Sequence, residues 1–159
     1  MLGRVVSTAV TMAVADTMAQ QGLGQKGVDW VRTGRYAVAG TVSLVPLFTV
    51  WYANVDRLFD RKLWVIKLWL ECFTVAPLYL AILIGNEELL RTRDLQSALT
   101  AINTKWATLY TESLKIVPVY QAINFALVPS HLRIYWLNSC QLLWNVYASH
   151  ILHKPRFTL

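Results

Sequence analysis

Charged residues divide this chain into long apolar segments. Asp, Glu, Lys and Arg are absent from residues 36–55, 72–86, 116–132 and 134–153. These runs are longer than the strands of a membrane β-barrel, which need about 9–11 residues, and they do not alternate between polar and apolar positions. A membrane-spanning helix needs about 20 mostly apolar residues. The pattern therefore predicts helices that cross a membrane.

Two of the four runs are shorter than 20 residues and are less certain to form a complete span from their sequence alone. The run at 72–86 is long enough if residues 68–70 are added and Glu71 is tolerated inside the span. The run at 116–132 has Pro118 and Pro129 near its two ends, where proline favours a kink or an end of the helix. The other two runs, residues 36–55 and 134–153, are each long enough for a complete span.

Two further segments have a weaker helical pattern. Residues 5–21 are mostly apolar but include Ser7, Thr8 and Asp16, and we expect a retained helix rather than a cleaved targeting segment. That helix either spans the membrane or packs on the bundle. Residues 95–110 repeat apolar side chains every three or four positions, which predicts an amphipathic connecting helix.

Composition supports a membrane protein built from these helices. Hydrophobic residues make up 55% of the 159 residues and charged residues 15%, against about 25% charged in soluble domains. Such a chain is too apolar to be disordered, and two cysteines do not make a disulfide scaffold. We therefore predict an all-α integral membrane bundle, a single domain over residues 1–159. It has about four spans, an N-terminal helix and an amphipathic connecting helix.

The net charge of +6 does not indicate a nucleic-acid-binding protein, because the basic residues lie between apolar runs rather than on one polar face. No nucleophile or phosphate-binding motif of the GxSxG or Walker A type is present. His131, His150 and His153 have no metal-ligand spacing with Cys or carboxylate residues. We expect no enzyme activity, no metal and no cofactor.

Polar residues inside or beside the apolar runs are the candidates for function. Asn138, Gln141, Asn145 and Ser149 share one face of a helix, and Gln121 and Asn124 are three residues apart. Ionisable groups near span ends are Asp16, Glu71 and Arg133. These side chains either line or gate a polar path, or they hold the bundle together by hydrogen bonds between helices. For Glu71, pairing with Lys67 at the membrane interface is the structural alternative.

An ordered set of motifs covers nearly the whole chain. Its C-terminal part reads Val117-Pro118, Gln121, Asn124-Phe125, Val128-Pro129, Arg133 and Trp144-Asn145-Val146-Tyr147-Ala148-Ser149. Upstream are Ala15-Asp16, Ala19-Gln20, Arg32-Thr33, Arg35, Val45-Pro46, Trp51-Tyr52, Asp56, Glu71 and Ala76-Pro77. This arrangement resembles the Mpv-seventeen family, also called the family of the peroxisomal membrane protein of twenty-two kilodaltons. Differences include Val117 where that family has Trp, and Glu71-Cys72 where it has Asp-Gln.

The resemblance implies a small multi-pass protein of the mitochondrial inner membrane, or alternatively of the peroxisomal membrane. It also implies a channel-like role for small solutes or metabolites in organelle homeostasis. The expected pore or gate residues are Asp16, Glu71, Gln121, Asn124, Arg133 and Asn145. The alternative is a non-conducting scaffold that binds partner proteins or lipids through residues 95–110. Expected partners are membrane lipids and small solutes or metabolites, with a homo-oligomer or a larger membrane assembly as further candidates and no nucleic acid.

Overall fold

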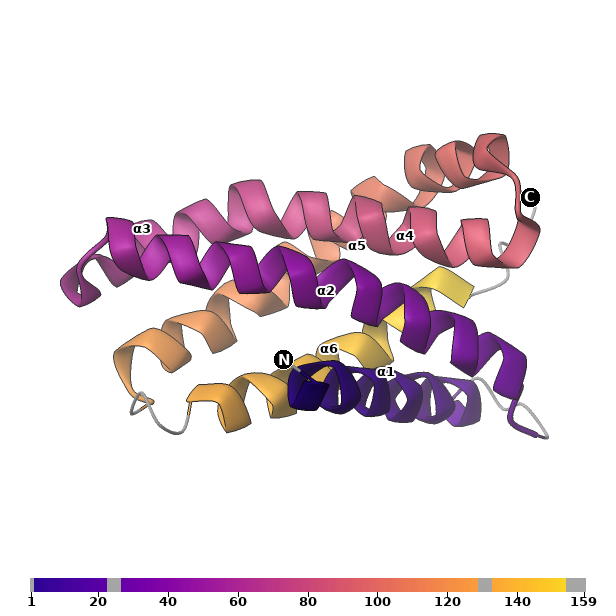
Figure 1. Cartoon of the computed structure of the whole chain (residues 1–159), viewed down its shortest axis with the longest axis horizontal. Helices are drawn as coiled ribbons and strands as arrows, with labels where there is room; N and C mark the ends of the chain where they lie inside the picture. Colours follow the sequence, from indigo (N-terminus) through magenta and orange to yellow (C-terminus); the bar gives the residue numbers. More distant parts are fainter. Residues whose placement is uncertain (1, 23–26, 129–132, 154–159) are drawn as a thin grey trace.

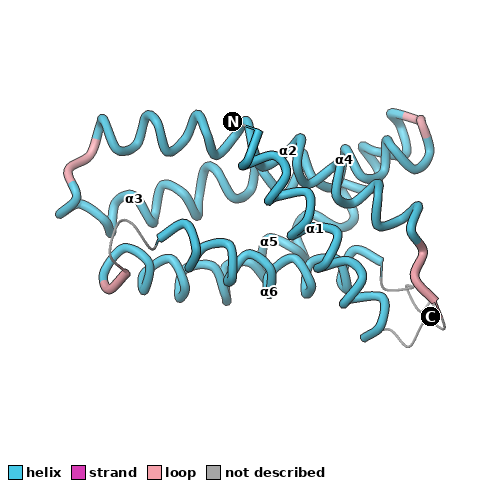
Figure 2. The backbone as a smooth tube through the Cα atoms, turned by 60° about the horizontal axis from the view of Figure 1, so that its bottom comes forward, coloured by secondary structure: helices cyan, strands magenta, loops and turns pink. Residues whose placement is uncertain are grey.

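The computed structural model describes residues 2–22, 27–128 and 133–153, and every regular element in these ranges is helical. The elements are α1 (Leu2–Gly22), α2 (Trp30–Leu58), η1 (Arg61–Leu63), α3 (Trp64–Leu70), η2 (Glu71–Val75), α4 (Ala76–Thr92), α5 (Leu95–Ala126) and α6 (Arg133–His153). Short described loops join long helices (Figure 2). The all-α prediction is confirmed.

The long helices pack in a closed ring. In chain order α1 packs on α2, α2 on α4, α4 on α5 and α5 on α6, and α6 returns to α1 (Figure 1). Each helix therefore has two neighbours in the ring. Side chains from different helices can meet in its interior, whatever their separation along the sequence.

The charge-free runs lie where helices were expected. Residues 36–55 belong to α2, and α6 contains residues 134–153. The run at 72–86 lies in a continuous helical segment, Trp64–Thr92, which is long and apolar enough to cross a membrane; it is the one such helix in the described part of the chain. Residues 5–21 lie in α1, which packs between α2 and α6. The expected number of four spans stays a prediction.

The expected connecting helix is not a separate element. Residues 95–110 and 116–126 form the single helix α5, and Pro118 lies inside it. The first half of α5 lies along α4 and η2: Trp106 Nε1 donates to the carbonyl of Pro77 at 2.9 Å, and the Tyr110 hydroxyl to that of Cys72 at 3.2 Å. The apolar run marked only the more hydrophobic half of a 32-residue helix.

Local sequence signals explain where helices begin and end. The Asp29 carboxylate accepts from the Arg32 N–H at 2.9 Å and caps α2. Asp94 caps α5 in the same way through Ser97, and these hydrogen bonds hold the pKa of Asp94 below its usual range. Arg93, with a φ of 56°, ends α4 in the left-handed region. The tight turn between α4 and α5 places these helices side by side.

A π-helical turn interrupts the long helix at Glu71–Val75. At its end the N–H of Ala76, the first residue of α4, donates to the carbonyl of Glu71, five residues back. Pro77 follows directly and has no N–H to donate, so a regular α-helical ladder would be broken here in any case. Such turns often occur at functional sites because they redirect side chains, and this one holds Glu71.

Candidate functional site

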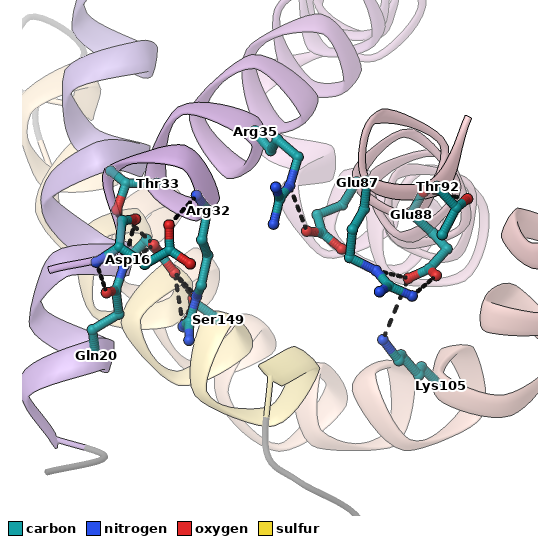
Figure 3. A network of polar contacts seen from close by, with 12 residues as sticks. Asp16, Gln20, Arg32, Thr33, Arg35, Glu87, Glu88, Thr92, Lys105 and Ser149 are labelled. Carbon is teal, nitrogen blue, oxygen red and sulfur yellow. Dashed lines mark hydrogen bonds and ion pairs between the residues drawn. The ribbon is translucent and has the colours of Figure 1, made fainter. Parts of the chain in front are cut away.

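Asp16 lies at the centre of a buried cluster that joins α1, α2 and α6. Its carboxylate is 0% exposed and accepts hydrogen bonds from four side chains. These donors are Arg32 (Nη2 at 2.9 Å, Nε at 3.0 Å), Thr33 (2.9 Å), Gln20 (2.7 Å) and Ser149. We call these five residues the Asp16 cluster (Figure 3). The charge of Asp16 is matched by Arg32, so the cluster satisfies the conditions for burying an ion pair.

A second set of charges lies near the Asp16 cluster, between α2, α4 and α5. Arg35, one helical turn after Arg32, extends toward Glu87 of α4, with Nε 4.0 Å from Oε1 (Figure 3). The neighbouring Glu88 pairs with Arg91 and lies 4.0 Å from Lys105 of α5. Together with the Asp16 cluster, these contacts place ion pairs on α1, α2, α4 and α5 and a hydrogen-bonding hydroxyl group on α6 at one end of the bundle.

Glu71 is the centre of a separate cluster of mostly neutral groups. The Glu71 carboxylate is 3% exposed and accepts from Trp51 Nε1 at 3.2 Å, Tyr52 OH at 3.5 Å and Gln121 Nε2 at 2.5 Å. Asn124 donates to Gln121 Oε1 at 3.3 Å. These five residues, the Glu71 cluster, connect α2, η2 and α5. The Glu71 side chain thus faces the interior of the bundle.

Asn145 lies between these clusters along the ring's interior. It is 0% exposed and one helical turn before Ser149, and its carbonyl accepts from the Tyr36 hydroxyl at 3.3 Å. Neither polar atom of its side-chain amide has a hydrogen-bonding partner in the described part of the protein. This is unusual, because buried side-chain polar atoms are almost always paired.

Apolar side chains close the space between the polar groups. Met12, Tyr36, Leu83 and Leu109 are all 0% exposed and belong to one core cluster, to which α6 contributes Trp144 and Ala148. A groove of about 390 Å³ lies outside this core, between α4 and α5, where Ala81 and Trp106 line it. The interior is therefore polar at two places and packed with apolar groups between them.

The structure brings some of the predicted site residues together and separates others. Glu71, Gln121 and Asn124 form one cluster, as the sequence suggested only for the last two. Asp16 belongs to the other cluster, and Asn145 to neither. The side chain of Arg133 lies outside the described part of the structure. No three His, Cys, Asp or Glu residues converge as metal ligands would within the described ranges.

Several contributing residues were not among the predicted site residues. Arg32, Thr33 and Gln20 bind Asp16, and Trp51 and Tyr52 bind Glu71. All five occur in the motifs that the chain shares with the family it resembles. Those motifs were the one feature of the sequence that could have identified these residues as part of the site. Arg35, Glu87 and Glu88 interact between helices, and no spacing along the chain indicates that.

Comparisons with known proteins agree with the resemblance. The sequence profile of the Mpv17 / PMP22 family matches residues 88–149. Protein SYM1 of Mycosarcoma maydis is 31% identical over 88% of this chain and 73% of its own length. Protein SYM1 of Gibberella zeae is 28% identical over 95% and 89%. No solved structure matches the chain at a significant level.

The names of relatives also support the predicted location. Mitochondrial inner membrane protein Mpv17 of Caenorhabditis briggsae is 26% identical over 96% of this chain and 86% of its own length. PXMP2/4 family protein 3 of Dictyostelium discoideum, 27% identical, supports the peroxisomal alternative. The location is thus the mitochondrial inner membrane, with the peroxisomal membrane as the alternative. With its helical bundle and its match to these relatives, the chain belongs to the Mpv17 / PMP22 family of membrane proteins.

Proposed function

We propose that this protein forms a channel-like pore for small solutes or metabolites and contributes to mitochondrial or peroxisomal homeostasis. The observation that carries the proposal is the set of buried polar side chains that face the interior of the ring, contributed by every helix in it. Polar groups inside a membrane bundle are costly, and they commonly mark the path of a solute or ion. The proposal includes a multi-pass arrangement of about four spans, surrounded by membrane lipids.

We assign this conformation to the closed state of the proposed pore, because its core is packed with apolar side chains. Met12, Leu83 and Leu109 fill the interior between the Asp16 cluster and the Glu71 cluster. Hydrophobic constrictions close channels because water does not stay in a narrow apolar segment. Opening then requires these side chains to move apart. The pore needs no catalytic residue, metal or cofactor.

Recording from purified protein in planar bilayers tests the proposal. We expect conductance, and we expect Glu71→Gln and Asn145→Leu to change its size or selectivity because both side chains lie in the interior. The matched control is Thr108→Val, on the exposed face of α5, which should leave conductance unchanged. Silent bilayers from protein with intact helical structure would reject the pore.

A scaffold that binds partner proteins, lipids or further copies of the chain is the second candidate, favoured by the outer face of α5. Leu95 and Leu99 are 66% and 48% exposed there, beside the exposed Thr100 and Thr104. Charge introduced by Thr100→Glu and Thr104→Glu should abolish recovery of such partners without unfolding the bundle. Arg91 is less suitable for this test, because it pairs with the buried Glu88.

A further inference from the structure

The outer face of α5 is polar beside a helical segment that is apolar enough to cross a membrane. Trp106 Nε1 donates to the Pro77 carbonyl at 2.9 Å, so this part of α5 lies level with the middle of Trp64–Thr92. The side chains that α5 exposes at this level include hydroxyl and amide groups. They are Thr100, Asn103, Thr104, Ala107, Thr108 and Thr111, and we call these six residues the α5 face.

The α5 face consists of two adjacent rows of mostly small side chains, with a spacing of four residues in each row. One row contains Asn103, Ala107 and Thr111, and the other contains Thr100, Thr104 and Thr108. Residues four apart are neighbours on a helix. Small side chains allow a second helix to approach closely in a membrane. The face is therefore suited to helix packing, and its exposure leaves it open to a helix from outside the bundle.

Asn103 has the largest unused hydrogen-bonding capacity on this face. The hydroxyl groups of Thr100, Thr104 and Thr111 each donate to a carbonyl of their own helix at 2.9 Å. No hydrogen bond joins the Asn103 side chain to another residue in the described ranges. Asn103 also lines the groove of about 390 Å³ between α4 and α5. An amide against hydrocarbon is costly, so such side chains in membrane bundles commonly hydrogen-bond to another helix.

We propose that the α5 face is the contact between two copies of this chain, with the two Asn103 amides hydrogen-bonded to each other. An amide both donates and accepts, so it can pair with an identical group, whereas an acyl chain offers it no partner. Two copies inserted in the same orientation are related by a twofold axis along the membrane normal, which brings the same patch of each copy together. The contact gives the surface of the second candidate function a definite occupant. It is independent of the pore, which lies inside each copy.

Charge on and beside the α5 face also favours an identical partner. The face itself carries no charged residue. Lys105 turns toward Glu88, with Nζ 4.0 Å from Oε2. Beyond Thr111, Glu112 and Lys115 pair with each other at 2.5 Å. Like charges across a contact cost several kcal/mol, and a second copy of this face would bring none together.

Oxidative cross-linking in proteoliposomes tests the contact. We expect Asn103→Cys to form a covalent dimer, with the unmodified protein giving the background from its own two cysteines. The control is Val42→Cys, which is 57% exposed on α2 and should stay at that background. In mild detergent, Asn103→Leu should weaken self-association about tenfold, measured by analytical ultracentrifugation, whereas Val42→Leu should not change it. Circular dichroism establishes that each variant is folded.

Several outcomes would overturn the contact. These are a monomeric unmodified protein, cross-linking of Asn103→Cys no stronger than that of Val42→Cys, and unchanged self-association of folded Asn103→Leu. Rapid modification of Asn103→Cys by a membrane-impermeant maleimide would also overturn it, because the α5 face would then be in water. Monomers that conduct would reject the contact and support the pore. Covalent dimers with silent bilayers would support the contact and reject the pore.

Discussion

Arg32 and Asp16 form an ion pair that the bundle buries almost completely, with side chains 7% and 0% exposed and Nη2 2.9 Å from Oδ1. The pair joins α2 to α1, and Ser149 of α6 donates to the same Asp16 oxygen. A buried charge is costly unless it is both paired and hydrogen-bonded. The position of three helices therefore depends on this one carboxylate and its partners.

Removing only the cation should destabilise the protein strongly. In Arg32→Met the Asp16 charge remains buried without its partner, and we expect the free energy of unfolding to fall by about 3–5 kcal/mol. The double variant Asp16→Asn with Arg32→Met leaves no unpaired charge and should recover part of that loss. Unfolding of the purified proteins in mild detergent measures both effects.

Lys115→Met is the control for this comparison. Lys115 pairs with Glu112 at 2.5 Å, but its side chain is 64% exposed, so its loss should change stability little. A double variant less stable than Arg32→Met alone would show that the hydrogen bonds of the Asp16 cluster, and not the neutralisation of charge, dominate its contribution.

Glu71 and Gln121 should behave as a coupled pair. In the unmodified protein Gln121 Nε2 lies 2.5 Å from Glu71 Oε1. Gln121→Glu places two carboxylates in this buried contact, so we expect it to be less stable than the other single variant, Glu71→Gln. Exchanging the residues, with Glu71→Gln and Gln121→Glu together, restores one carboxylate and one amide. We expect a coupling of about 0.5–3 kcal/mol from the four unfolding measurements. Strictly additive effects would contradict the contact.

Close packing of α1 on α2 depends on Gly40. A Cβ atom at this position would lie 2.8 Å from Cε and Sδ of Met12, which is 0% exposed and has little room to move. Gly40→Ala should therefore lower stability by about 1–3 kcal/mol despite the higher helix propensity of Ala. Adding Met12→Val, which shortens the opposing side chain, should restore part of the loss.

Gly34 provides the matched control in the same helix. Nothing lies within 4 Å of a Cβ atom there, so Gly34→Ala should be neutral or stabilise the protein by up to about 1 kcal/mol. Thermal unfolding of the two variants side by side measures the difference. Equal effects at both positions would mean that the contact with Met12 does not limit the approach of α1.

The helices were predictable from sequence because the signal for them is local. Charge-free runs mark residues 36–55 and 134–153 directly, since the length of a span is encoded in consecutive residues. The extent of α5 was not predictable in this way. Its first half is less apolar than its second, and Pro118 suggested a boundary that the structure places inside the helix.

In the candidate site, too, contacts between residues close in sequence were predictable and contacts between distant residues were not. Gln121 and Asn124 are three residues apart, and their common face follows from helical periodicity. The contact between Gln121 and Glu71 joins residues 50 positions apart, and that between Ser149 and Asp16 joins residues 133 apart. Such pairs depend on the order of helices in the ring, which the pattern of apolar residues does not specify. For Glu71 the sequence could therefore offer only the local partner Lys67.

The apolar layer between the two clusters is expected to control opening of the proposed pore. Leu83→Asn changes a fully buried core side chain to a polar one of similar size, which favours water in the constriction. We expect a larger open fraction in single-channel recordings. Leu90→Asn, on the same helix but 43% exposed, is the control and should leave the open fraction unchanged. Fewer openings from folded Leu83→Asn would contradict this prediction. The entry of water at Leu83 would then not limit conduction, and the closed gate would lie elsewhere in the bundle.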